Sequence, residues 1–529
     1  MRIGIEGSSR KPSASSAAEP GAPPGGALEF SYPPPHRDFQ FAFLAILAGV
    51  LARILLMLLG TGTLIDDAYI TLRYGRNLFE GHGLVYNQGE HVLGTQPLYA
   101  LWAGLLWKVS DLLFGGRGVE YLITLANIGF FALAAALFAR WMKVRSLLLV
   151  HVPLVVLCCY VPFLDNTTTG METSLFLLLI TFSLDALHRR KLLLTSVLLG
   201  LAALTRPEGN LWALAVVLNE VLHRRLGWRL LLPYTAMVAS WGAFAALYYG
   251  TPVPLSARAK SGWFNGIYAN EGFLRQLWDV LASFTLGPWP DWHHWRTPAA
   301  AAALLILVLC FLFARGLAAL RKERDPKIIW PVFFVLCVTF YVAGRGATWP
   351  SWYAIPPGLG FVVGVVHGIE ALSGARLARF RLSPGRLRFV LVVLSFVFLV
   401  TSVLIWNRVR LPYYLNVRES HERTGRTLAR AADPDDTLFV VEIGCIGYFA
   451  DRYVYDMGGL VSPEIQALRR RSWDLGEAPN LVKRFWPDWI VVNDIHLLKL
   501  LHSEPEGWFE DRYALEFRTY LYFTYRKRS

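Results

Sequence analysis

Long apolar runs constrain the fold of this chain more than any other feature. A helix needs roughly 20 mainly apolar residues to cross the hydrocarbon core of a bilayer. Of the 529 residues, 54% are hydrophobic and only 17% are charged, and the mean hydropathy is +0.38. Soluble domains usually carry about a quarter charged residues. The sequence therefore predicts an α-helical polytopic membrane protein.

The loops between the apolar runs alternate in charge, which predicts their sidedness. Lys and Arg concentrate in cytoplasmic loops of membrane proteins. The loops "RWMKVR", "HRRK" and "HRRLGWR" are strongly basic, whereas "LDNTTTG" and "RPEGN" hold at most one basic residue. The amino terminus is therefore expected in the cytoplasm, and the loops 61–118 and 250–297, with the tail after residue 408, outside. We predict about eleven spans: 39–60, 119–140, 146–163, 171–187, 192–205, 209–222, 230–249, 298–314, 328–344, 353–371 and 387–407.

Three segments in the first part of the chain need separate interpretation. Residues 1–38 are rich in Pro, Ala, Ser and Gly without an apolar period, which predicts a disordered cytoplasmic arm. The first apolar run lacks a following small-residue cleavage site, so it is expected to be a retained anchor. The segment 97–114 is short for a span and carries Lys108 and Asp111. We expect it to lie as an interfacial helix on the outer surface, because spanning would reverse every later loop.

The basic net charge of +13 does not require a nucleic-acid partner. Basic cytoplasmic loops of a protein embedded in a lipid bilayer account for it. The chain shows no zinc or redox spacing among its five cysteines, and Cys445 stands alone in the polar tail. A disulfide within the tail is therefore excluded.

The tail 408–529 has the composition of a small extracytoplasmic α/β domain. Its runs "DTLFVVEIG", "RYVYDMGG" and "DWIVVND" are β-rich and bounded by turn residues, and "RESHERTGRTLARAA" predicts an exposed helix before them. The stretch "GCIGYFA" lacks the full dinucleotide-binding fingerprint, so we predict a tight turn there. The intervening 39–407 would form the transmembrane part, with the outer loops 61–118 and 250–297.

Two adjacent carboxylates, Asp66 and Asp67, follow the first span directly. Such a pair can simply cap a helix N-terminus, where Asp accepts free N–H groups and complements the dipole. The following residues predict an amphipathic helix that carries Arg73 and Arg76 on its other faces. A helix of this kind suits a membrane surface. It also suits a substrate with a hydroxyl to deprotonate and a phosphate to hold.

Further polar and aromatic residues are expected on the same outer face. Each has a simpler interpretation: aromatics favour membrane interfaces, Arg206 and Glu208 can form a local pair, and Lys260 can extend toward water. Their convergence on one side, at several helix ends, favours a binding site. The candidate substrate-binding residues are Arg73, Arg76, Glu172, Arg206, Glu208, Arg258, Lys260, Arg345, Trp349 and Tyr353.

The stretches "LIDDAYITLRYGRNLFEGHGLVYN" (64–87) and "GEHVLGTQPLYALW" (89–102) resemble the start of GT-C-fold integral membrane glycosyltransferases. The similarity is strongest to the branch containing the actinobacterial terminal arabinofuranosyltransferases. "LTRPEG" and "GYFADRYVYDMGGL" also resemble recurring pieces of these proteins. The chain departs from the family in "LGTQPL" and in "GRGATWPSW", where the family often has an acidic stretch.

The resemblance implies inverting transfer of a sugar, arabinofuranose in that branch, from a polyprenyl-phosphate donor. The acceptor would be a cell-envelope glycan or lipid on the outer face of a bacterial cytoplasmic membrane. In such a reaction one aspartate takes a proton from the acceptor hydroxyl, and basic residues stabilise the leaving phosphate. We expect Asp66 to be this base and Asp67 to orient it or bind sugar hydroxyls. Lys260, Arg258 and Arg345 are the phosphate candidates.

The sequence identifies no cofactor. A divalent cation between Asp66 and Asp67 stays open, because two carboxylates are too few to define a metal site. A lipid or glycan transporter or flippase is the alternative function, but it should show internal repeats and ionisable residues near mid-membrane, and neither is evident. A non-catalytic assembly or adhesion protein would act through the tail.

The charge alternation predicts that the two ends of the chain lie on opposite sides of the membrane. A reporter fused after Arg145 should give a cytoplasmic signal, and one fused after Leu411 an outside signal. An outside signal at Arg145 would contradict the predicted topology.

Overall fold

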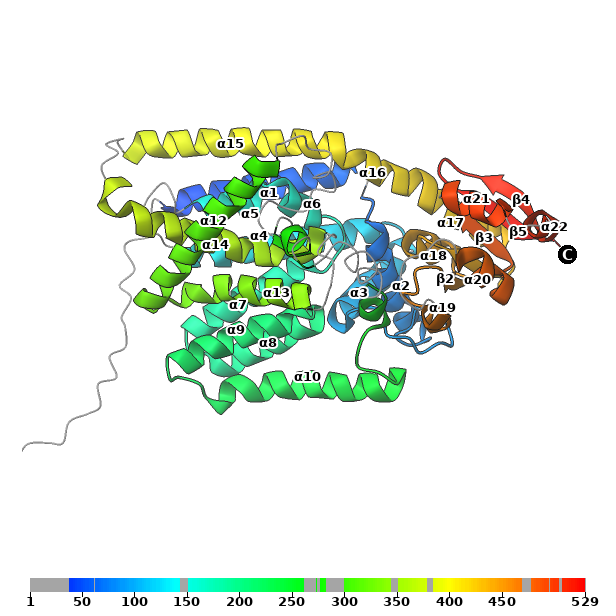
Figure 1. Ribbon diagram of the computed structural model, residues 1–529, viewed down its shortest axis with the longest axis horizontal. Coiled ribbons are helices and arrows are strands. Elements are labelled where there is room, and N and C mark those ends of the chain that lie inside the picture. Colours follow the sequence, from blue (N-terminus) through cyan, green and yellow to red (C-terminus); the bar gives the residue numbers. More distant parts are fainter. Residues whose placement is uncertain are drawn as a thin grey trace, which may run out of the picture.

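The computed structural model describes residues 38–60, 62–142, 151–260, 273, 276–281, 299–343, 351–377, 384–468, 477–493, 495–503 and 507–528. The predicted arm, but for Asp38, and the candidates Arg345 and Trp349 lie outside these residues. Helices make up a long bundle, and a small α/β unit formed by the tail lies at one end of it (Figure 1). The predicted combination of a helical membrane part and a carboxy-terminal α/β unit is confirmed.

Seven of the predicted spans correspond to helices that can cross a membrane by length and composition. Most of them run along the long axis of the molecule (Figure 1). They are α1 (Asp38–Leu59), α4 (Val119–Trp141), α10 (Trp228–Tyr249), α12 (Ala299–Glu323), α13 (Ile329–Ala343), α14 (Ser351–Leu377) and α15 (Pro384–Val409).

The other four predicted spans differ from this pattern. Helices α7 (Thr173–His188), α8 (Leu192–Thr205) and α9 (Glu208–Leu222) are present but shorter than a span of this kind. The predicted span 146–163 is wrong as one continuous helix, because α5 (Val152–Cys159) and α6 (Val161–Asn166) are separated by the extended Tyr160. A proline near the start of α6 fits its first turn but could not continue α5.

Arg53 of α1 supplies hydrogen bonds to the broken helix. Its guanidinium donates to the carbonyl oxygens of Cys158 at 3.0 Å and Phe163 at 3.1 Å, and to Thr167 Oγ1 at 2.5 Å. Carbonyl oxygens left unpaired at a helix break need hydrogen-bond donors where no water is present, and a buried guanidinium needs acceptors. Arg53 therefore serves the fold.

Helix α2 (Asp66–Glu80) is buried on several sides. It crosses α3 (Pro97–Phe114) so closely that a Cβ on Gly75 would lie 2.5 Å from the backbone oxygen of Ala100. On another side α2 packs against α18 (Ile443–Ala450) of the tail. The predicted helix is therefore confirmed, and the surrounding protein buries all of its residues 68–77.

The carboxy-terminal unit is built on a five-stranded sheet of order β2-β1-β3-β5-β4. Strand β1 pairs in parallel with β2 and β3, whereas β5 runs antiparallel to β3 and β4. The three predicted strands are confirmed as β1, β2 and β3, and β4 and β5 were not predicted. The strands are β1 (Thr437–Val440), β2 (Tyr453–Asp456), β3 (Trp489–Val492), β4 (Tyr513–Arg518) and β5 (Phe523–Lys527).

Short helices complete the unit. The predicted helix before the strands is formed by the π-helical turn η2 (Val417–Glu422) and α17 (Arg423–Ala431), which follow α16 (Leu411–Asn416). It is exposed on one side only, because Ser420, Thr424 and Leu428 are buried. The stretch "GCIGYFA" lies within α18, so the predicted tight turn is wrong. The remaining helices are α19 (Pro463–Leu468), α20 (Ala478–Phe485), α21 (Ile495–Ser503) and α22 (Trp508–Arg512).

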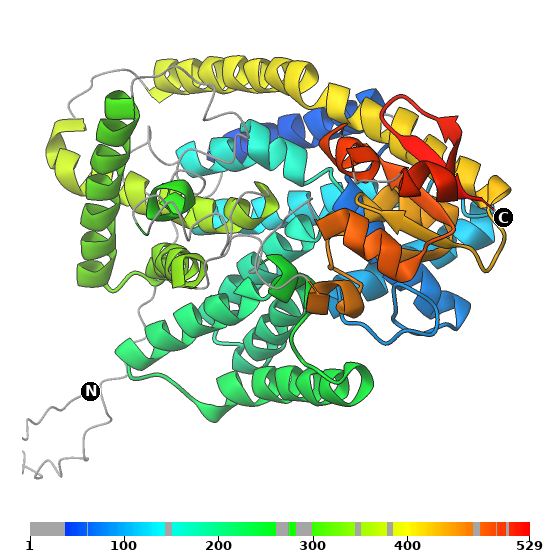
Figure 2. The ribbon, with the colours of Figure 1, turned by 45° about the vertical axis from the view of Figure 1, so that its right-hand side comes forward.

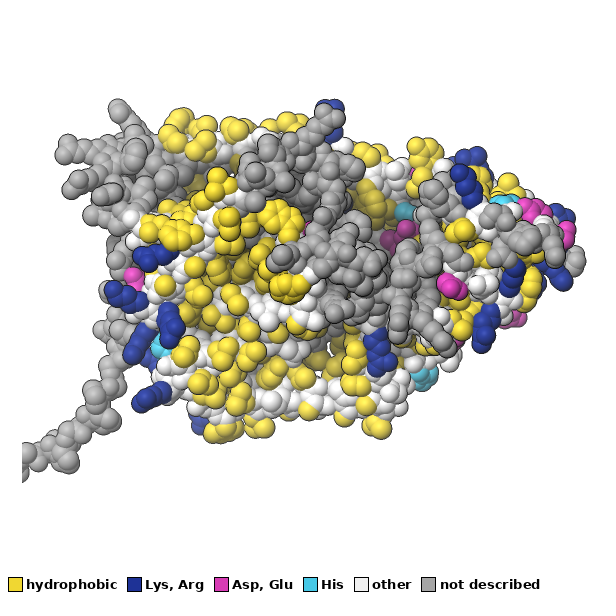
Figure 3. All heavy atoms as spheres, in the orientation of Figure 1, with side chains coloured by type: hydrophobic (Ala, Val, Ile, Leu, Met, Phe, Trp, Pro, Cys, Tyr) yellow, Lys and Arg dark blue, Asp and Glu magenta, His cyan; other side chains and the backbone are white. Residues whose placement is uncertain are grey.

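Side-chain types divide the surface by position. Hydrophobic side chains cover the flank of the helical bundle, and Lys and Arg gather at the end opposite the carboxy-terminal unit (Figure 3). An apolar flank with basic groups at one end is the distribution expected of a protein embedded in a bilayer.

The crossing of α2 and α3 should not tolerate a methyl group. Gly75→Ala should lower the free energy of unfolding by about 1–3 kcal/mol, the usual cost of overpacking a close contact. Gly129→Ala in α4 is the matched control, because its Cβ would meet nothing within 4 Å. Thermal unfolding of both variants in detergent measures the difference, and equal midpoints would contradict the close crossing.

Candidate functional site

A cavity of about 630 Å³ lies where α2, the ends of α7 and α8, α10 and the segment after α10 meet. Its volume is in the usual range for small-molecule sites. Asp67, Arg206 and Lys260 line it among apolar and aromatic residues such as Trp241 and Tyr353. Charged groups from separate parts of the chain therefore meet in one partly enclosed space.

Asp67 faces this cavity from the first turn of α2. Thr71 follows one turn later on the same lining face and shares a hydrogen bond of 3.0 Å with Thr95. The ammonium of Lys260 lies 3.6 Å from Asp67 Oδ1 and donates to the Tyr353 hydroxyl at 3.2 Å. A carboxylate, an ammonium and a phenol are thus brought together.

Arg206 forms a buried ionic cluster in the wall beside Tyr353. It donates to Glu172 at 2.7 Å and to Glu208 at 2.7 Å, and Tyr341 donates to Glu208 at 2.5 Å. Its guanidinium carbon lies 5.1 Å from the centre of the Tyr353 ring. The predicted local pair between Arg206 and Glu208 is confirmed, with Glu172 as a further partner. Buried charges need such partners, because an unpaired one is very costly.

Asp66 points away from the cavity. Its carboxylate accepts the backbone N–H groups of Gly444 at 2.9 Å and Cys445 at 2.7 Å, at the start of α18. The N-cap of α2 itself is Ile65, which makes no side-chain hydrogen bond. Asp66 therefore caps a helix that lies 378 residues further along the chain.

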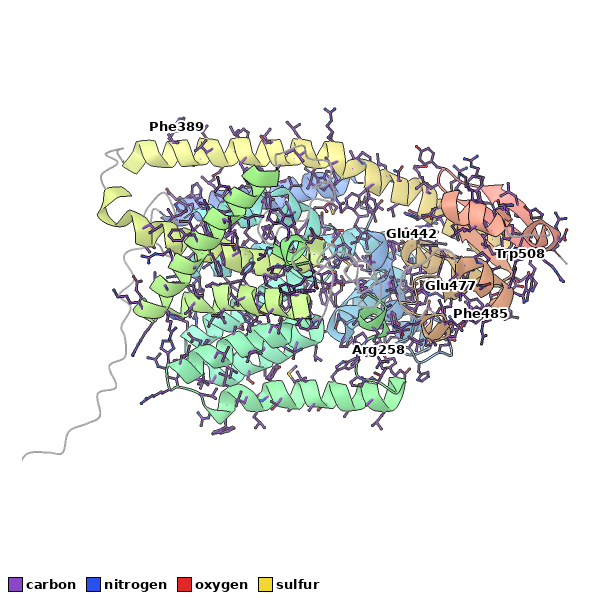
Figure 4. All side chains as sticks on the ribbon, in the orientation of Figure 1. Arg258, Phe389, Glu442, Glu477, Phe485 and Trp508 are labelled. Carbon is purple, nitrogen blue, oxygen red and sulfur yellow. The ribbon has the colours of Figure 1, made fainter. Side chains whose placement is uncertain are left out.

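Burial raises the pKa of Asp66 to about 7, against the lowering effect of its backbone hydrogen bonds. The charge of Asp67 raises this pKa further. Glu442, at the N-cap of α18, has a pKa raised to about 8 by burial and by the same two aspartates. Figure 4 shows Glu442 beside this helix.

Arg73 and Arg76 also contact the carboxy-terminal unit. Arg73 donates to the carbonyl oxygens of Gly447 at 2.8 Å and Arg452 at 2.7 Å. Arg76 donates to the carbonyl oxygen of Tyr448 at 3.1 Å and forms an ion pair with Asp451. Both arginines attach α2 to α18, and neither is among the described residues that line the cavity.

The remaining candidates are divided. Arg258 is exposed on the segment after α10, where Figure 4 labels it, and it donates to Thr251 Oγ1 at 2.6 Å. Of the candidates within the described residues, the cavity brings together Asp67, Glu172, Arg206, Lys260 and Tyr353. Among those same described residues, no group of three or more His, Cys, Asp and Glu is arranged to hold a metal ion.

Several cavity residues were not predicted. Thr71 could have been found, because it follows Asp67 at helical spacing. Trp241 and Asn210 come from helices interpreted only as spans. Leu460 comes from the carboxy-terminal unit, and no local sequence signal indicates that it would reach the cavity.

Comparison with known proteins gives partial matches. Over 252 residues the chain is 28% identical to a terminal β-(1→2)-arabinofuranosyltransferase of Mycobacterium tuberculosis, covering 42% of this chain and 40% of that protein. Over 287 residues it is 27% identical to the protein of that name from Corynebacterium glutamicum, covering 46% and 38%. The chain thus spans less than half the length of either relative. The resemblance stated from the motifs is thereby confirmed.

Two further comparisons concern the tail and the fold. Residues 411–526 match a domain of unknown function, DUF8728. A solved structure of an Archaeoglobus fulgidus oligosaccharyltransferase, tethered with an acceptor peptide, aligns with a TM-score of 0.48 at 11% identity. The alignment covers 93% of this chain and 74% of that chain.

The raised pKa of Asp66 predicts how pH affects stability. Its ordinary pKa is 3.8, so its stabilising contribution is complete below that pH and is lost as the pH rises through about 7. Between pH 5 and 7, Asp66→Asn should therefore gain stability relative to the unmodified protein, by up to about 1.4 kcal/mol per pH unit. Thermal midpoints across this range measure the gain. A difference independent of pH would contradict burial of the titrating group.

Proposed function

We propose that the protein is an inverting glycosyltransferase that uses a polyprenyl-phosphate sugar donor. The acceptor is a hydroxyl of a cell-envelope glycan or lipid on the outer face of the membrane, and the sugar is of the arabinofuranose type. The two arabinofuranosyltransferases that match part of the chain support sugar transfer as the reaction and arabinofuranose as the sugar. The donor class is supported by the cavity and by its position at the ends of membrane helices.

The observation that carries the proposal is the pairing of Asp67 with Lys260 inside the cavity, 3.6 Å apart. A carboxylate can accept the proton of an attacking hydroxyl. An ammonium can stabilise negative charge on a leaving phosphate, most strongly where little water is present. The two groups that glycosyl transfer requires therefore line one space.

In the proposed transfer, one bond forms and one bond breaks at the anomeric carbon of the sugar. The acceptor oxygen forms a bond to the anomeric carbon while the bond from that carbon to the donor phosphate oxygen breaks. The acceptor proton passes to Asp67, and the electron pair of the broken bond leaves with the polyprenyl phosphate. Lys260 compensates the charge on that phosphate, and Arg206 remains bound to Glu172 and Glu208 in the wall.

Inversion constrains where Lys260 acts. The acceptor and the leaving group lie on opposite faces of the sugar, so the base and the phosphate-binding group must be separated by it. Lys260 must therefore leave Asp67 when the donor binds and remain on the side of Tyr353, whose hydroxyl it already contacts at 3.2 Å. The predicted roles of the acidic pair are exchanged in this proposal, because Asp67 lines the cavity and Asp66 does not.

The distribution of charge supports the proposed orientation. Basic side chains gather at the end of the bundle opposite the carboxy-terminal unit (Figure 3). The cavity lies toward that unit, which contributes Leu460 to its wall. With the basic end in the cytoplasm, the cavity opens on the outer side. No nucleotide-sugar pool is expected there, so a lipid-linked donor is the suitable source of activated sugar.

Replacing each carboxylate by an amide distinguishes the roles of the two aspartates. Asp67→Asn should lower kcat by about 10²–10⁴-fold, the usual contribution of a general base. Asp66→Asn should cost much less, since Asn also serves as a helix cap. Turnover with a polyprenyl-phosphate-linked sugar measures both. A large loss at Asp66 with near-normal turnover at Asp67 would return the base to Asp66.

Replacing Lys260 examines the donor end. Lys260→Ala should raise the KM for the lipid-linked donor more than the KM for the acceptor, because it removes the phosphate partner. Arg258→Ala is the matched control, as this exposed arginine bonds only to Thr251 among the contacts described. Unchanged donor kinetics in Lys260→Ala would exclude this role.

A further inference from the structure

Helix α18 lies against α2, and two of its glycines stand where no side chain would fit. A Cβ on Gly444 would lie 1.8 Å from the backbone oxygen of Asp66, and a Cβ on Gly447 would lie 2.0 Å from the hydroxyl oxygen of Tyr86. The two glycines are three residues apart, so they share one face of the helix. The stretch "GCIGYFA" is thus the surface by which the tail docks.

Polar contacts surround this glycine face. Asp66 binds the N-terminus of α18, Arg73 binds the carbonyl of Gly447, and the Tyr86 hydroxyl donates to the carbonyl of Ile443 at 2.6 Å. Most of these contacts go to backbone groups. They therefore fix where the helix lies and how it is rotated, whatever side chains it carries.

Helix α18 influences the cavity through its contacts with the first turn of α2. Asp66 and Asp67 are consecutive there, and Ile65 provides no side-chain cap. The bonds from Asp66 to Gly444 and Cys445 fix the rotation of this turn, and that rotation directs Asp67 toward Lys260. A side chain misplaced by 1 Å can cost about 10²-fold in rate.

The same unit also supplies part of the cavity wall. The Asp456 carboxylate accepts the backbone N–H groups of Gly458 at 2.7 Å and Val461 at 3.1 Å, which holds the intervening loop. Leu460 of that loop lines the cavity. Figure 2 shows α19 beside the segment that follows α10, and Gln466 of α19 donates there to the Leu255 carbonyl at 3.4 Å.

We propose that the carboxy-terminal unit is a positioning element of the active site, with Asp66 as the positioning residue that links α18 to α2. This inference rests on the proposed role of Asp67 as the base. The unit is then required within the same chain because it orients the base and closes the cavity.

The experiment perturbs both sides of the contact in the full chain. Gly444→Ala adds a methyl group where Asp66 lies, and Asp66→Ala removes the acceptor of two N–H bonds. Asp66→Asn is the conservative variant. The controls are Gly129→Ala, whose Cβ meets nothing within 4 Å, and Asp325→Ala, which removes a cap from the distant helix η1 (Pro326–Ile328).

Kinetics and hydrogen–deuterium exchange give separate readouts. Gly444→Ala and Asp66→Ala should each lower kcat by about 10–100-fold with little change in donor KM. Asp66→Asn should recover most of the activity, and the double variant should be little worse than the poorer single one. Deuterium uptake should rise in peptides covering residues 66–72 and 443–450, and not in either control.

The outcomes separate this inference from the proposed function. Raised uptake with normal kcat would overturn the positioning role while leaving the docking contact intact. Unchanged uptake in both α2 and α18 would overturn the contact itself. If the unmodified protein transfers no sugar, the proposed function fails. Raised uptake in α2 caused by Gly444→Ala would then still show that the tail orders that helix.

Discussion

The close packing of α2 on both sides is the constraint on which the candidate site depends. Gly75 admits the backbone of α3 on one side, and Gly444 admits the backbone of α2 to α18 on the other. A helix held by backbone contacts cannot rotate without breaking many of them at once, because packed interiors deform little. The direction of Asp67 is therefore set by contacts made well away from the cavity.

Charge burial near α2 follows from the same packing. Asp66, Arg73 and Arg76 are 8%, 2% and 8% exposed. Asp66 and Arg73 bond to backbone groups of the tail, whereas Arg76 bonds to one backbone carbonyl and pairs with the carboxylates of Asp451 and Glu80. Arg206 is compensated instead by two carboxylates. Burial of a charge is tolerated only where partners replace water. These residues thus belong to the framework, and Lys260, whose side chain is 24% exposed, remains accessible to a substrate.

Sequence periodicity predicted much of the architecture, and its failures have physical causes. Apolar runs identified the seven long helices because length and hydropathy are local properties. The proline near the start of α6 is a local signal for the break at Tyr160 and was overlooked within an apolar run. The partner that makes the break tolerable, Arg53, lies more than 100 residues away. Strands β4 and β5 were missed because "YALEFR" and "FTYRK" mix charged with apolar residues. Of the predicted site, Glu172 and Arg206 line the same cavity as Asp67, since each lies at a helix end.

The acidic pair illustrates why local sequence could not assign roles within the site. Both interpretations of the pair, a cap and a catalytic group, were open for each aspartate. Side chains of consecutive helical residues point about 100° apart. Asp66 therefore faces α18 while Asp67 faces the cavity, although the two residues are adjacent in sequence. The Asp67 side chain is 36% exposed and lines the cavity, so a substrate bound there can reach it. Asp66 binds the N–H groups of Gly444 and Cys445 with its two oxygens and does not line the cavity, so an acceptor there does not reach it. Asp66 thus holds the helical turn from which its neighbour Asp67, the proposed base, faces the cavity.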